Sequence, residues 1–477
     1  MSKDLGEVTV EGQSNYSTTT GMTYLPTKRQ KSIAQNMTDL LRAMAIPQIN
    51  VDVRSNDVTD NAGDEVALFI NYLPATEEDR QGLRCDDVRK VEYLISPSDP
   101  RFRGAKKVLN FTVQEYEYGG YTKLSTALKG TQSFASINSA FSKFVYKKFT
   151  YDLFANFRYF DDPHLNYSED NLYTLLDSDG KPYEFHRAQI VDKGIIRQKQ
   201  APLTFRATYN SDKVQIRNTI GYNFLSSPKF YSRGHLFTSS DPNGDNTYFR
   251  SNRWRTNSIS YTGDYYFVLP HDFSLSVAPG FSYSYNHRYF DYKSTLETPI
   301  SYDTKENAYA YNLSANLSRK LNSHHTLGMY LYTGGDFNDV KYGIGNSSGP
   351  QHFRTYHSTA SLKYTFSGGK WYISSYWGLG YDVTQNNLIK ISDVYPRVDL
   401  FTRYTINNSN SIDFGLQYQN QVPSSSYKTD EILQRDEILY REGNPFLKSY
   451  NSLSRRPVRR LLRHHELNGV NSTIVIR

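Results

Sequence analysis

The sequence has little cysteine, little tryptophan and no long apolar run. Of its 477 residues, one is a cysteine (Cys85) and three are tryptophans. The single cysteine excludes a disulfide framework and argues against a cysteine-based metal site. No apolar run reaches the roughly 18 residues that a transmembrane helix needs, and mean hydropathy is −0.65. A helical span is therefore excluded, whereas a membrane barrel is not, because only every second residue of its strands faces lipid.

The first residues of the chain have no signal-peptide pattern, and the last residues carry most of its net positive charge. The first residues, MSKDLGEVTVEGQ, hold no apolar core and no cleavage site, so we expect no signal peptide in this chain. The net charge of +7 comes mostly from Asn451 onward, where six arginines stand against one acidic residue. The rest of the chain is close to neutral, so its charge does not predict nucleic-acid binding. For the last segment alone, binding to anionic lipid or nucleic acid stays an alternative.

Tyrosine and phenylalanine are abundant, with 41 and 26 residues. Such aromatic side chains suit a pleated surface and the polar interface of a membrane. From Tyr121 onward, apolar and polar residues alternate, which is typical of strands with one apolar face. The clearest stretch runs from Phe273 to Asn286, FSLSVAPGFSYSYN, with apolar residues at odd positions and small or polar residues at even ones.

Strands of this kind fit two architectures. In a soluble sandwich the apolar faces meet in a core, whereas in a membrane barrel they face lipid and the polar faces line the interior. Several segments are longer than the usual soluble strand, and short turns alternate with long polar segments, which favours the barrel. The pattern predicts about 13 strands. Short turns are expected at 145–148, 210–213, 270–272, 320–325, 367–370 and 407–410, and long segments near 161–200, 226–251, 288–305, 335–352, 382–396 and 420–445.

The first hundred residues have a different pattern. Ser32 to Met44 carries apolar residues at helical spacing, which predicts one amphipathic helix. Short β-prone pieces follow at 48–54, 65–73 and 108–113, and Cys85 to Val91 predicts a second short helix. Together these elements predict a small α+β domain of about 115 residues.

A small α+β domain ahead of a long run of antiparallel strands resembles the TonB-dependent receptors of Gram-negative outer membranes. Gly6 to Glu11 (GEVTVE) is similar to the energy-coupling box of this family, and Glu442 to Lys448 (EGNPFLK) is similar to a loop late in its barrels. The motifs that resemble its plug domain are Asp39-Leu40-Leu41, Ile49 to Val53, Leu68 to Leu73, Val91-Glu92-Tyr93-Leu94, Pro97-Ser98, Gly104-Ala105 and Val108-Leu109-Asn110-Phe111. We single out as family residues Glu7, Val8, Thr9 and Val10 in the coupling segment and Val91, Glu92, Pro97, Ser98, Gly104, Ala105 and Asn110 in the plug.

The resemblance implies a fold and a function. Residues 1–12 would be the energy-coupling segment, 13–116 the plug domain, 117–450 a partial outer-membrane β-barrel and 451–477 an atypical basic tail. The plug would fill a lumen too wide for side chains. The implied activity is import of a siderophore, oligosaccharide or peptide, with outer-membrane lipid and a TonB-type protein as partners. The resemblance implies neither a cofactor nor enzymatic activity.

The chain departs from this family in two respects. About 13 strands fall short of the roughly 22 strands of a complete transporter barrel. Family members end on a strand with a terminal aromatic residue, whereas this sequence ends on Ile476-Arg477. We therefore expect a truncated form. Two alternatives stay open, namely a soluble or surface-anchored all-β binding protein and a passive outer-membrane channel.

Other chemistry finds little support in the sequence. Two adjacent histidine pairs, His324-His325 and His464-His465, have no third ligand close in the sequence. No Ser-His-Asp spacing, glycine-rich phosphate loop or zinc motif is present. We therefore expect neither a catalytic site nor a metal site.

Overall fold

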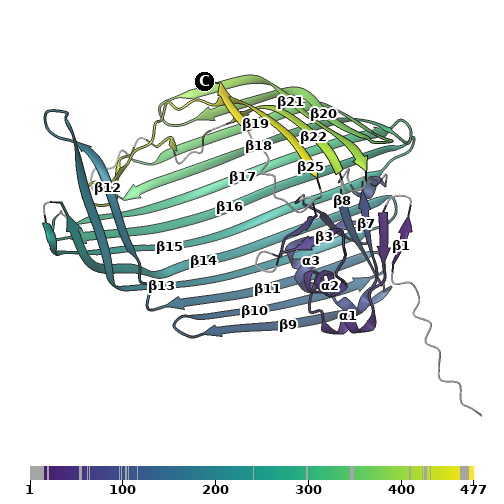
Figure 1. Ribbon diagram of the computed structural model, residues 1–477, viewed down its shortest axis with the longest axis horizontal. Coiled ribbons are helices and arrows are strands. Elements are labelled where there is room, and N and C mark those ends of the chain that lie inside the picture. Colours follow the sequence, from purple (N-terminus) through teal and green to yellow (C-terminus); the bar gives the residue numbers. More distant parts are fainter. Residues whose placement is uncertain are drawn as a thin grey trace, which may run out of the picture.

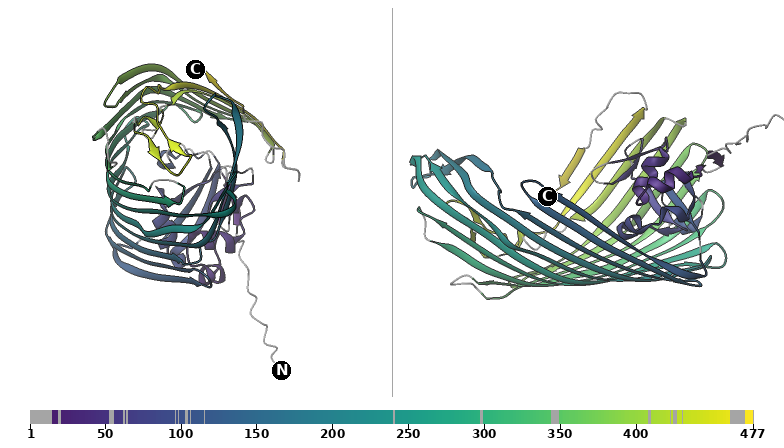
Figure 2. Two further views of the ribbon diagram at one scale, coloured as in Figure 1. Left: turned by 90° about the vertical axis from the view of Figure 1, so that its left-hand side faces the viewer. Right: turned by 90° about the horizontal axis from the view of Figure 1, so that it is seen from below.

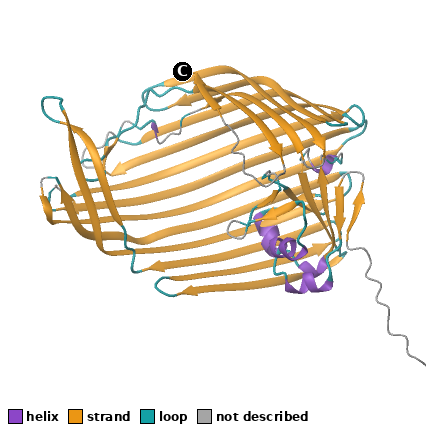
Figure 3. Cartoon of the chain, viewed as in Figure 1, coloured by secondary structure: helices purple, strands orange, loops and turns teal. Residues whose placement is uncertain are grey.

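The computed structural model describes most of the chain. The described residues are 15–18, 21–52, 56–61, 63, 65–95, 97, 99–102, 105, 107–114, 116–239, 241–296, 299–343, 349–407, 410–421, 423, 427–429, 431–461 and 472–476. Among them, no helix is long and apolar enough to cross a membrane. Figure 3 shows that the main helices gather at one end of the molecule, and that strands form nearly all the rest.

The N-terminal domain is a small α+β unit built on a six-stranded sheet with the order β1-β2-β7-β8-β5-β6. Its core is formed by buried side chains of the helices and of the central strands β7 and β8, including Leu40, Val91 and Phe111. Its strands are β1 (Asn15–Thr18), β2 (Gly21–Tyr24), β3 (Ile49–Val51), β4 (Val58–Asp60), β5 (Ala67–Ile70), β6 (Leu73–Pro74), β7 (Val88–Ile95) and β8 (Lys107–Val113), and its helices are α1 (Lys28–Ile33), α2 (Met37–Met44), α3 (Glu77–Gly82), η1 (Cys85–Asp87) and η2 (Pro100–Phe102).

The helices of this domain differ from the prediction in two places. The single helix expected over Ser32 to Met44 is divided between α1 and α2, because the Asn36 side chain accepts the backbone N–H of Asp39 at 2.9 Å and starts a new helix there. The helix expected over 85–91 is only the turn η1, and β7 begins at Val88. Val88 and Val91 are buried in the core, and this packing favours the strand.

The rest of the chain forms one large antiparallel sheet of sixteen strands (Figure 1). Neighbours in sequence are neighbours in the sheet from β9 to β22, except that β12 pairs only with the outer part of β13 and projects as an arm. The strands are β9 (Tyr118–Gly130), β10 (Phe134–Tyr146), β11 (Phe149–Asp162), β12 (Ser168–Leu176), β13 (Pro182–Asn210), β14 (Val214–Thr238), β15 (Asp241–Val268), β16 (Phe273–Ser294), β17 (Ile300–Lys320), β18 (His325–Gly343), β19 (Gln351–Gly368), β20 (Trp371–Gln385), β21 (Lys390–Asn407), β22 (Asn410–Gln421), β25 (Tyr450–Leu461) and β26 (Ser472–Ile476).

The connections between strands agree with the prediction at the end of the sheet that carries the short turns. They differ at the opposite end, where long loops were expected. All six predicted short turns join consecutive strands, from the β10–β11 turn to the β21–β22 turn. The predicted long segments are mostly strand, since β14 runs to Thr238 and β15 starts at Asp241, where a loop over 226–251 was expected. These strands are 25 and 28 residues long, whereas about 10 residues cross the hydrocarbon region of a membrane. Their polar ends therefore extend the sheet well past any apolar band.

The sheet curls into an open trough, and the N-terminal domain lies inside the curve near the short turns (Figure 2). On the outer face, large apolar side chains such as Ile259, Phe281 and Leu313 are exposed. On the inner face, Arg206 and Tyr292 are buried against other parts of the chain. The apolar rows thus point outward and do not pack against one another in a dry core, as a soluble sandwich requires. The predicted fold class, an incomplete antiparallel barrel preceded by a small α+β domain, is confirmed.

The segment expected to be a basic tail is partly strand. β25 pairs with β22 along its length, and β26 pairs with β25. Backbone pairing with β22 therefore continues past the predicted boundary at 450, as far as Leu461. β9 and β26 are the two ends of the strand order, and no described strand pairs with their outer sides.

The long connection between β22 and β25 folds back into the trough. It contains the two-stranded hairpin of β23 (Leu433–Gln434) and β24 (Tyr440–Arg441). Figure 2 shows this hairpin within the curve of the sheet. We call residues 427–429 and 431–441 the inward segment.

Candidate functional site

The contact between the N-terminal domain and the sheet is centred on one buried arginine. Arg206 of β13 donates from Nη1 to Asp79 Oδ2 at 2.9 Å, and its Nη2 forms a very short contact with Asp79 Oδ1. From Nε it donates to Asp152 of β11 at 2.9 Å. The Arg206 side chain is 6% exposed, so both ion pairs are shielded from water. A guanidinium therefore bridges two carboxylates, one from each domain, with the planar geometry that arginine favours.

The start of α3 places Asp79 for this contact. Thr76 caps the helix by accepting the Asp79 backbone N–H at 3.3 Å, and the Asp79 carboxylate accepts the Thr76 backbone N–H at 2.9 Å. Burial alone would raise the pKa of Asp79, but the positive charges of Arg206 and Arg217 outweigh this effect and lower the pKa to about 2. Asp79 is therefore ionised at neutral pH, and its negative charge holds the N-terminal domain to the sheet.

Further polar contacts surround this ion pair. Arg217 of β14 donates to the backbone oxygen of Pro74 at 2.6 Å. Lys123 of β9 donates to the backbone oxygen of Gln81 at 2.8 Å, and Tyr121 donates to that of Gly82 at 3.1 Å. The interface is thus made mainly of hydrogen bonds to charged or polar side chains on the inner face, as the polar inner rows of the strands require.

One glycine lets α3 approach the sheet closely. A Cβ atom at Gly82 would lie 2.9 Å from the ring of Phe141 on β10, which is shorter than van der Waals contact. Phe141 is itself buried. Any side chain at position 82 would therefore push the helix away from β10 and from Arg206.

The predicted plug residues that the structure describes lie together inside the N-terminal domain. Val91 is fully buried in β7. Glu92 and Asn110 face each other across β7 and β8, and the Asn110 amide donates to Glu92 at 3.0 Å. Asn110 also accepts the backbone N–H of Tyr72 at 3.2 Å, which fixes the chain after β5. Their contacts described here hold the N-terminal domain together.

Two other predicted residues lie at the edges of the N-terminal domain. Ala105 packs against the buried cluster of Phe69, Phe102 and Val108. Pro97 is half-buried between β7 and η2. The predicted residues Glu7, Val8, Thr9, Val10, Ser98 and Gly104 lie outside the described residues.

A second set of buried charges fastens the inward segment to the inner face of the sheet. Asp436 is fully buried, and its carboxylate lies 3.0 Å from Arg187 Nη1 of β13 and 3.8 Å from Arg250 Nη2 of β15. Tyr292 of β16 donates to Glu437 at 2.5 Å. Because these contacts lie at the end of the sheet opposite the short turns, the inward segment narrows the trough on that side.

Polar side chains also cluster on the inner face of β19 to β22. Asp382 is buried, forms a very short contact with His357 and accepts the Asn420 amide at 2.8 Å. Tyr395 donates to the same carboxylate at 3.4 Å. Within the described part of the chain, no group of three or more histidine, cysteine, aspartate or glutamate side chains has a geometry that fits a metal ion. The cluster is a polar lining of the interior.

Sequence reasoning did not single out Asp79, Arg206, Arg187 or Asp436. One signal for Asp79 was present, because Thr76-Glu77-Glu78-Asp79 has the spacing of a capping box. The arginines occupy inward positions of alternating strands, and such positions carry polar residues in any barrel. Which of them is buried against a carboxylate depends on how the domains dock.

No protein-family model matches the sequence. No curated protein matches it either.

The chain is similar to solved structures of transport proteins and receptors. The alcaligin outer membrane receptor FauA from Bordetella pertussis is 12% identical, with a TM-score of 0.43, over 92% of this chain and 67% of the other. The copper transporter OprC is 10% identical, with a TM-score of 0.47, over 93% of this chain and 69% of the other. The ferric yersiniabactin uptake receptor FyuA from Yersinia pestis is 11% identical, with a TM-score of 0.35, over 96% of both chains.

Proposed function

We propose that this chain is a TonB-dependent outer-membrane receptor that imports a ligand through a plugged barrel. The observation that carries the proposal is the docking of the N-terminal domain on the polar inner face of the sheet through the Asp79–Arg206 ion pair. A domain held in this way occupies the lumen through mainly polar contacts, with Phe141 of β10 as a buried apolar contact at Gly82. It can shift when hydrogen bonds and ion pairs exchange, which suits a plug that opens on demand.

The outer face supports residence in a membrane. Exposed apolar residues follow one another on alternate positions of β17 and β18, including Leu313 and Leu331. An apolar band of this extent is costly when it is exposed to water. In a bilayer its side chains contact lipid tails instead. The soluble alternative needs these rows to be buried, and the passive channel has no use for a domain inside its lumen.

The partners of the proposed receptor are inferred from the family resemblance. Residues Glu7 to Val10 would bind the TonB-type protein as an added strand. The ligand enters from the opposite end, where the inward segment narrows the trough, and its class, whether siderophore, oligosaccharide or peptide, stays a prediction. Transport also needs the outer sides of β9 and β26 to be paired, because an unsatisfied backbone group in lipid costs several kcal/mol. The truncation inferred from the sequence likewise stays a prediction.

Membrane insertion gives the first test. Leu313→Lys places a charge in the middle of the apolar band and should cost about 2–4 kcal/mol of stability in the membrane. Ser314→Lys, one residue away on the inner face, should cost little. Resistance of the folded chain to urea extraction from phosphatidylcholine vesicles measures both. Equal effects of the two substitutions, or a wild-type chain that stays soluble as a monomer without detergent, would contradict the proposal.

Energy coupling gives the second test. Val8→Pro removes a backbone N–H that an added strand needs, so it should abolish binding to the periplasmic domain of a TonB-type protein. Gln13→Pro, outside the coupling segment, is the matched control and should bind as the wild type does. Binding that survives Val8→Pro would refute the assignment of this segment.

A further inference from the structure

The ends of four long strands carry basic side chains on the outer face of the sheet. Alternate residues of β15, β16, β17 and β18 point outward, as the exposed side chains of Ile259, Phe281, Leu313 and Leu331 show. The same parity, followed toward the end away from the N-terminal domain, places Arg255, His287, Lys305 and Lys341 on the outer face. We call these four residues the cationic row.

The register of the strands puts the cationic row in a straight line. Arg255 is the direct partner of His287, His287 of Lys305, and Lys305 of Lys341. Neighbouring strands lie about 4.8 Å apart, so four basic side chains are aligned over about 15 Å. Lys305 and Lys341 are like charges directly opposite each other on neighbouring strands, and such pairs destabilise a sheet.

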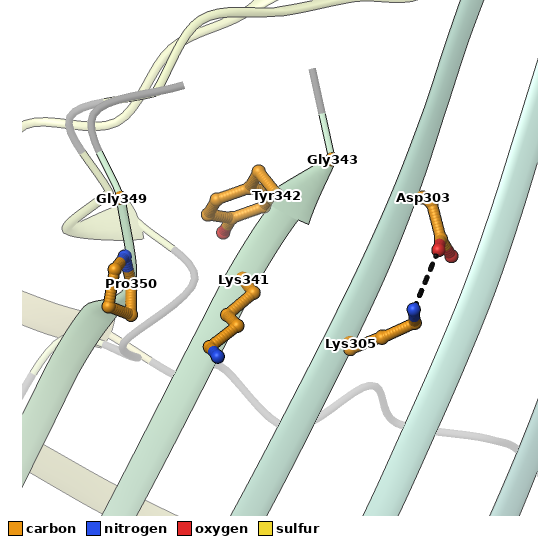
Figure 4. Close-up of a pocket in the computed structure, with 7 residues that line it drawn as sticks. All are labelled: Asp303, Lys305, Lys341, Tyr342, Gly343, Gly349 and Pro350. Atoms are coloured by element: carbon orange, nitrogen blue, oxygen red, sulfur yellow. Dashed lines mark ion pairs between the residues drawn. The ribbon is translucent and has the colours of Figure 1, made fainter. Parts of the chain in front are cut away.

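The chain supplies one carboxylate to this row. Asp303, two residues farther along β17 and therefore on the same face, forms a very short contact with His287 and lies 3.2 Å from Lys305 Nζ. Figure 4 shows the Asp303–Lys305 ion pair, with Lys341 on the adjacent strand directed away from the carboxylate. No described carboxylate pairs with Arg255 or Lys341, and both residues are exposed. The two ends of the row therefore keep uncompensated positive charge.

Two depressions frame the row on the surface. One, of about 350 Å³, is lined by Asp303, Lys305 and Lys341 together with Gly349 and Pro350, which precede β19. The other, of about 380 Å³, lies on the Arg255 side and includes Tyr289. The guanidinium of Arg253 stacks 4.3 Å from the Tyr289 ring, at the edge of the second depression. The row thus lies beside two shallow, open depressions that small charged groups can enter.

The distance of the cationic row from the apolar band, measured along the strands, decides which part of the membrane the row contacts. Arg255 is four residues beyond Ile259, and Lys305 is four residues beyond Tyr309, which is about 13 Å along each strand. Tyrosine rings next to the band, including Tyr283 and Tyr309 with ring centroids 4.8 Å apart, mark the level where headgroups begin. The cationic row is then at the level of headgroup phosphates.

We propose that the cationic row binds phosphate groups of anionic lipid headgroups in the leaflet at this end of the strands. The inference rests on the proposed membrane residence. Phosphate oxygens accept hydrogen bonds from Arg255 and Lys341, where the chain provides no acid, while Asp303 keeps the centre of the row from repelling itself. The site holds lipid at the protein surface and requires no movement of the N-terminal domain.

The test uses the full chain in a non-ionic detergent, titrated with dioctanoyl phosphatidylglycerol and with dioctanoyl phosphatidylcholine by calorimetry. Arg255→Gln combined with Lys341→Gln should weaken phosphatidylglycerol binding about 25-fold, about fivefold for each cation. The charge-preserving pair Arg255→Lys with Lys341→Arg should stay within about twofold of the wild type. Arg319→Gln with Lys320→Gln, which removes two cations from the other end of β17, is the matched control and should leave the affinity unchanged.

The outcomes separate this inference from the proposed function. If the wild type inserts into phosphatidylcholine vesicles but binds phosphatidylglycerol no tighter than phosphatidylcholine, the lipid site is refuted and the receptor stands. If the wild type does not insert at all, the proposed function fails and the inference fails with it. Equal loss in the control pair shows a general charge effect and overturns the site. Displacement of the lipid by an equal concentration of inorganic phosphate shows a site for free phosphate and overturns the assignment to lipid.

Discussion

The ion pair between Asp79 and Arg206 should control how readily the N-terminal domain opens. Asp79→Asn keeps the size and the capping position of the side chain but removes its charge. Arg206 then retains only Asp152, so that a buried guanidinium loses one of its two carboxylates. The inner face of the sheet offers no other acid at this place among the described contacts of Arg206.

The stability that Asp79→Asn should lose follows from the lowered pKa of Asp79. The pKa of Asp79 falls from 3.8 to about 2 in the folded chain, which corresponds to about 2 kcal/mol of stabilisation of the ionised form. Removing one partner of a buried pair costs about 3–5 kcal/mol when the other is left alone, and here Asp152 reduces the cost. A loss of about 2 kcal/mol raises the equilibrium constant for opening about 30-fold.

The single cysteine supplies the assay. Cys85 is buried next to α2, and its Sγ donates to the Asn36 backbone oxygen at 3.3 Å. Burial raises the pKa of the thiol to about 11, although Lys123 opposes the shift. A maleimide therefore reacts only when this region opens, and its rate at pH 7 reports the opening constant. Asp79→Asn should accelerate labelling about 30-fold.

Glu77→Gln is the matched control, because it removes the same charge from the same turn of α3. The Glu77 side chain is 50% exposed and pairs with Arg80 at 2.5 Å, and such a surface pair is worth only about 0.3–0.5 kcal/mol. Labelling should change by about twofold. If both substitutions accelerate labelling equally, or if Asp79→Asn has no effect, the ion pair does not hold the domain. Asp79→Asn added to Arg206→Gln should have a smaller effect than on its own.

Three other outcomes are expected. Acidification from pH 5 to pH 2 should raise the opening constant of the N-terminal domain, measured by hydrogen exchange, more in the wild type than in Asp79→Asn. The lowered pKa of Asp79 stabilises the folded chain above pH 3.8, and this stability is lost as the pH falls through about 2. Gly82→Val should accelerate labelling of Cys85 through its clash with Phe141, and Phe141→Ala should restore the slow rate, so a rate that is insensitive to Phe141→Ala would refute the clash. Asp436→Asn should destabilise the inward segment by about 3–5 kcal/mol, because it leaves Arg187 buried without its acid; trypsin cleavage within 427–441 should then become faster, and Glu442→Gln should leave it unchanged.

The alternation of apolar and polar residues predicted the sheet well because each face of a strand has one environment, either apolar or polar. FSLSVAPGFSYSYN places its apolar residues outward on β16 as expected, and the short turns end where the alternation is interrupted by glycine, proline and polar residues. The long connections were less predictable. Polar residues over 226–251 suggested a loop, but a strand that extends into water is also polar, so composition does not distinguish the two.

The candidate site depended on contacts that the sequence does not record. Thr76 and Asp79 mark the start of a helix, and Arg206 stands at an inward position of a strand, but 127 residues separate Asp79 from Arg206. Either residue alone reads as a solvated charge. Their pairing follows from the depth at which the N-terminal domain sits and from the register of β11, β13 and β14.

The sequence by itself determined the two-part organisation of this protein, the division of each strand into an apolar and a polar face and the positions of its tight turns, because these follow from local periodicity. Only the tertiary structure decided which inward charges become buried ion pairs, how far the strands continue past the apolar band and which basic side chains meet in one row across four strands. Burial and strand register arise when segments from distant parts of the chain come together. A local sequence pattern does not record which distant segment a residue will contact.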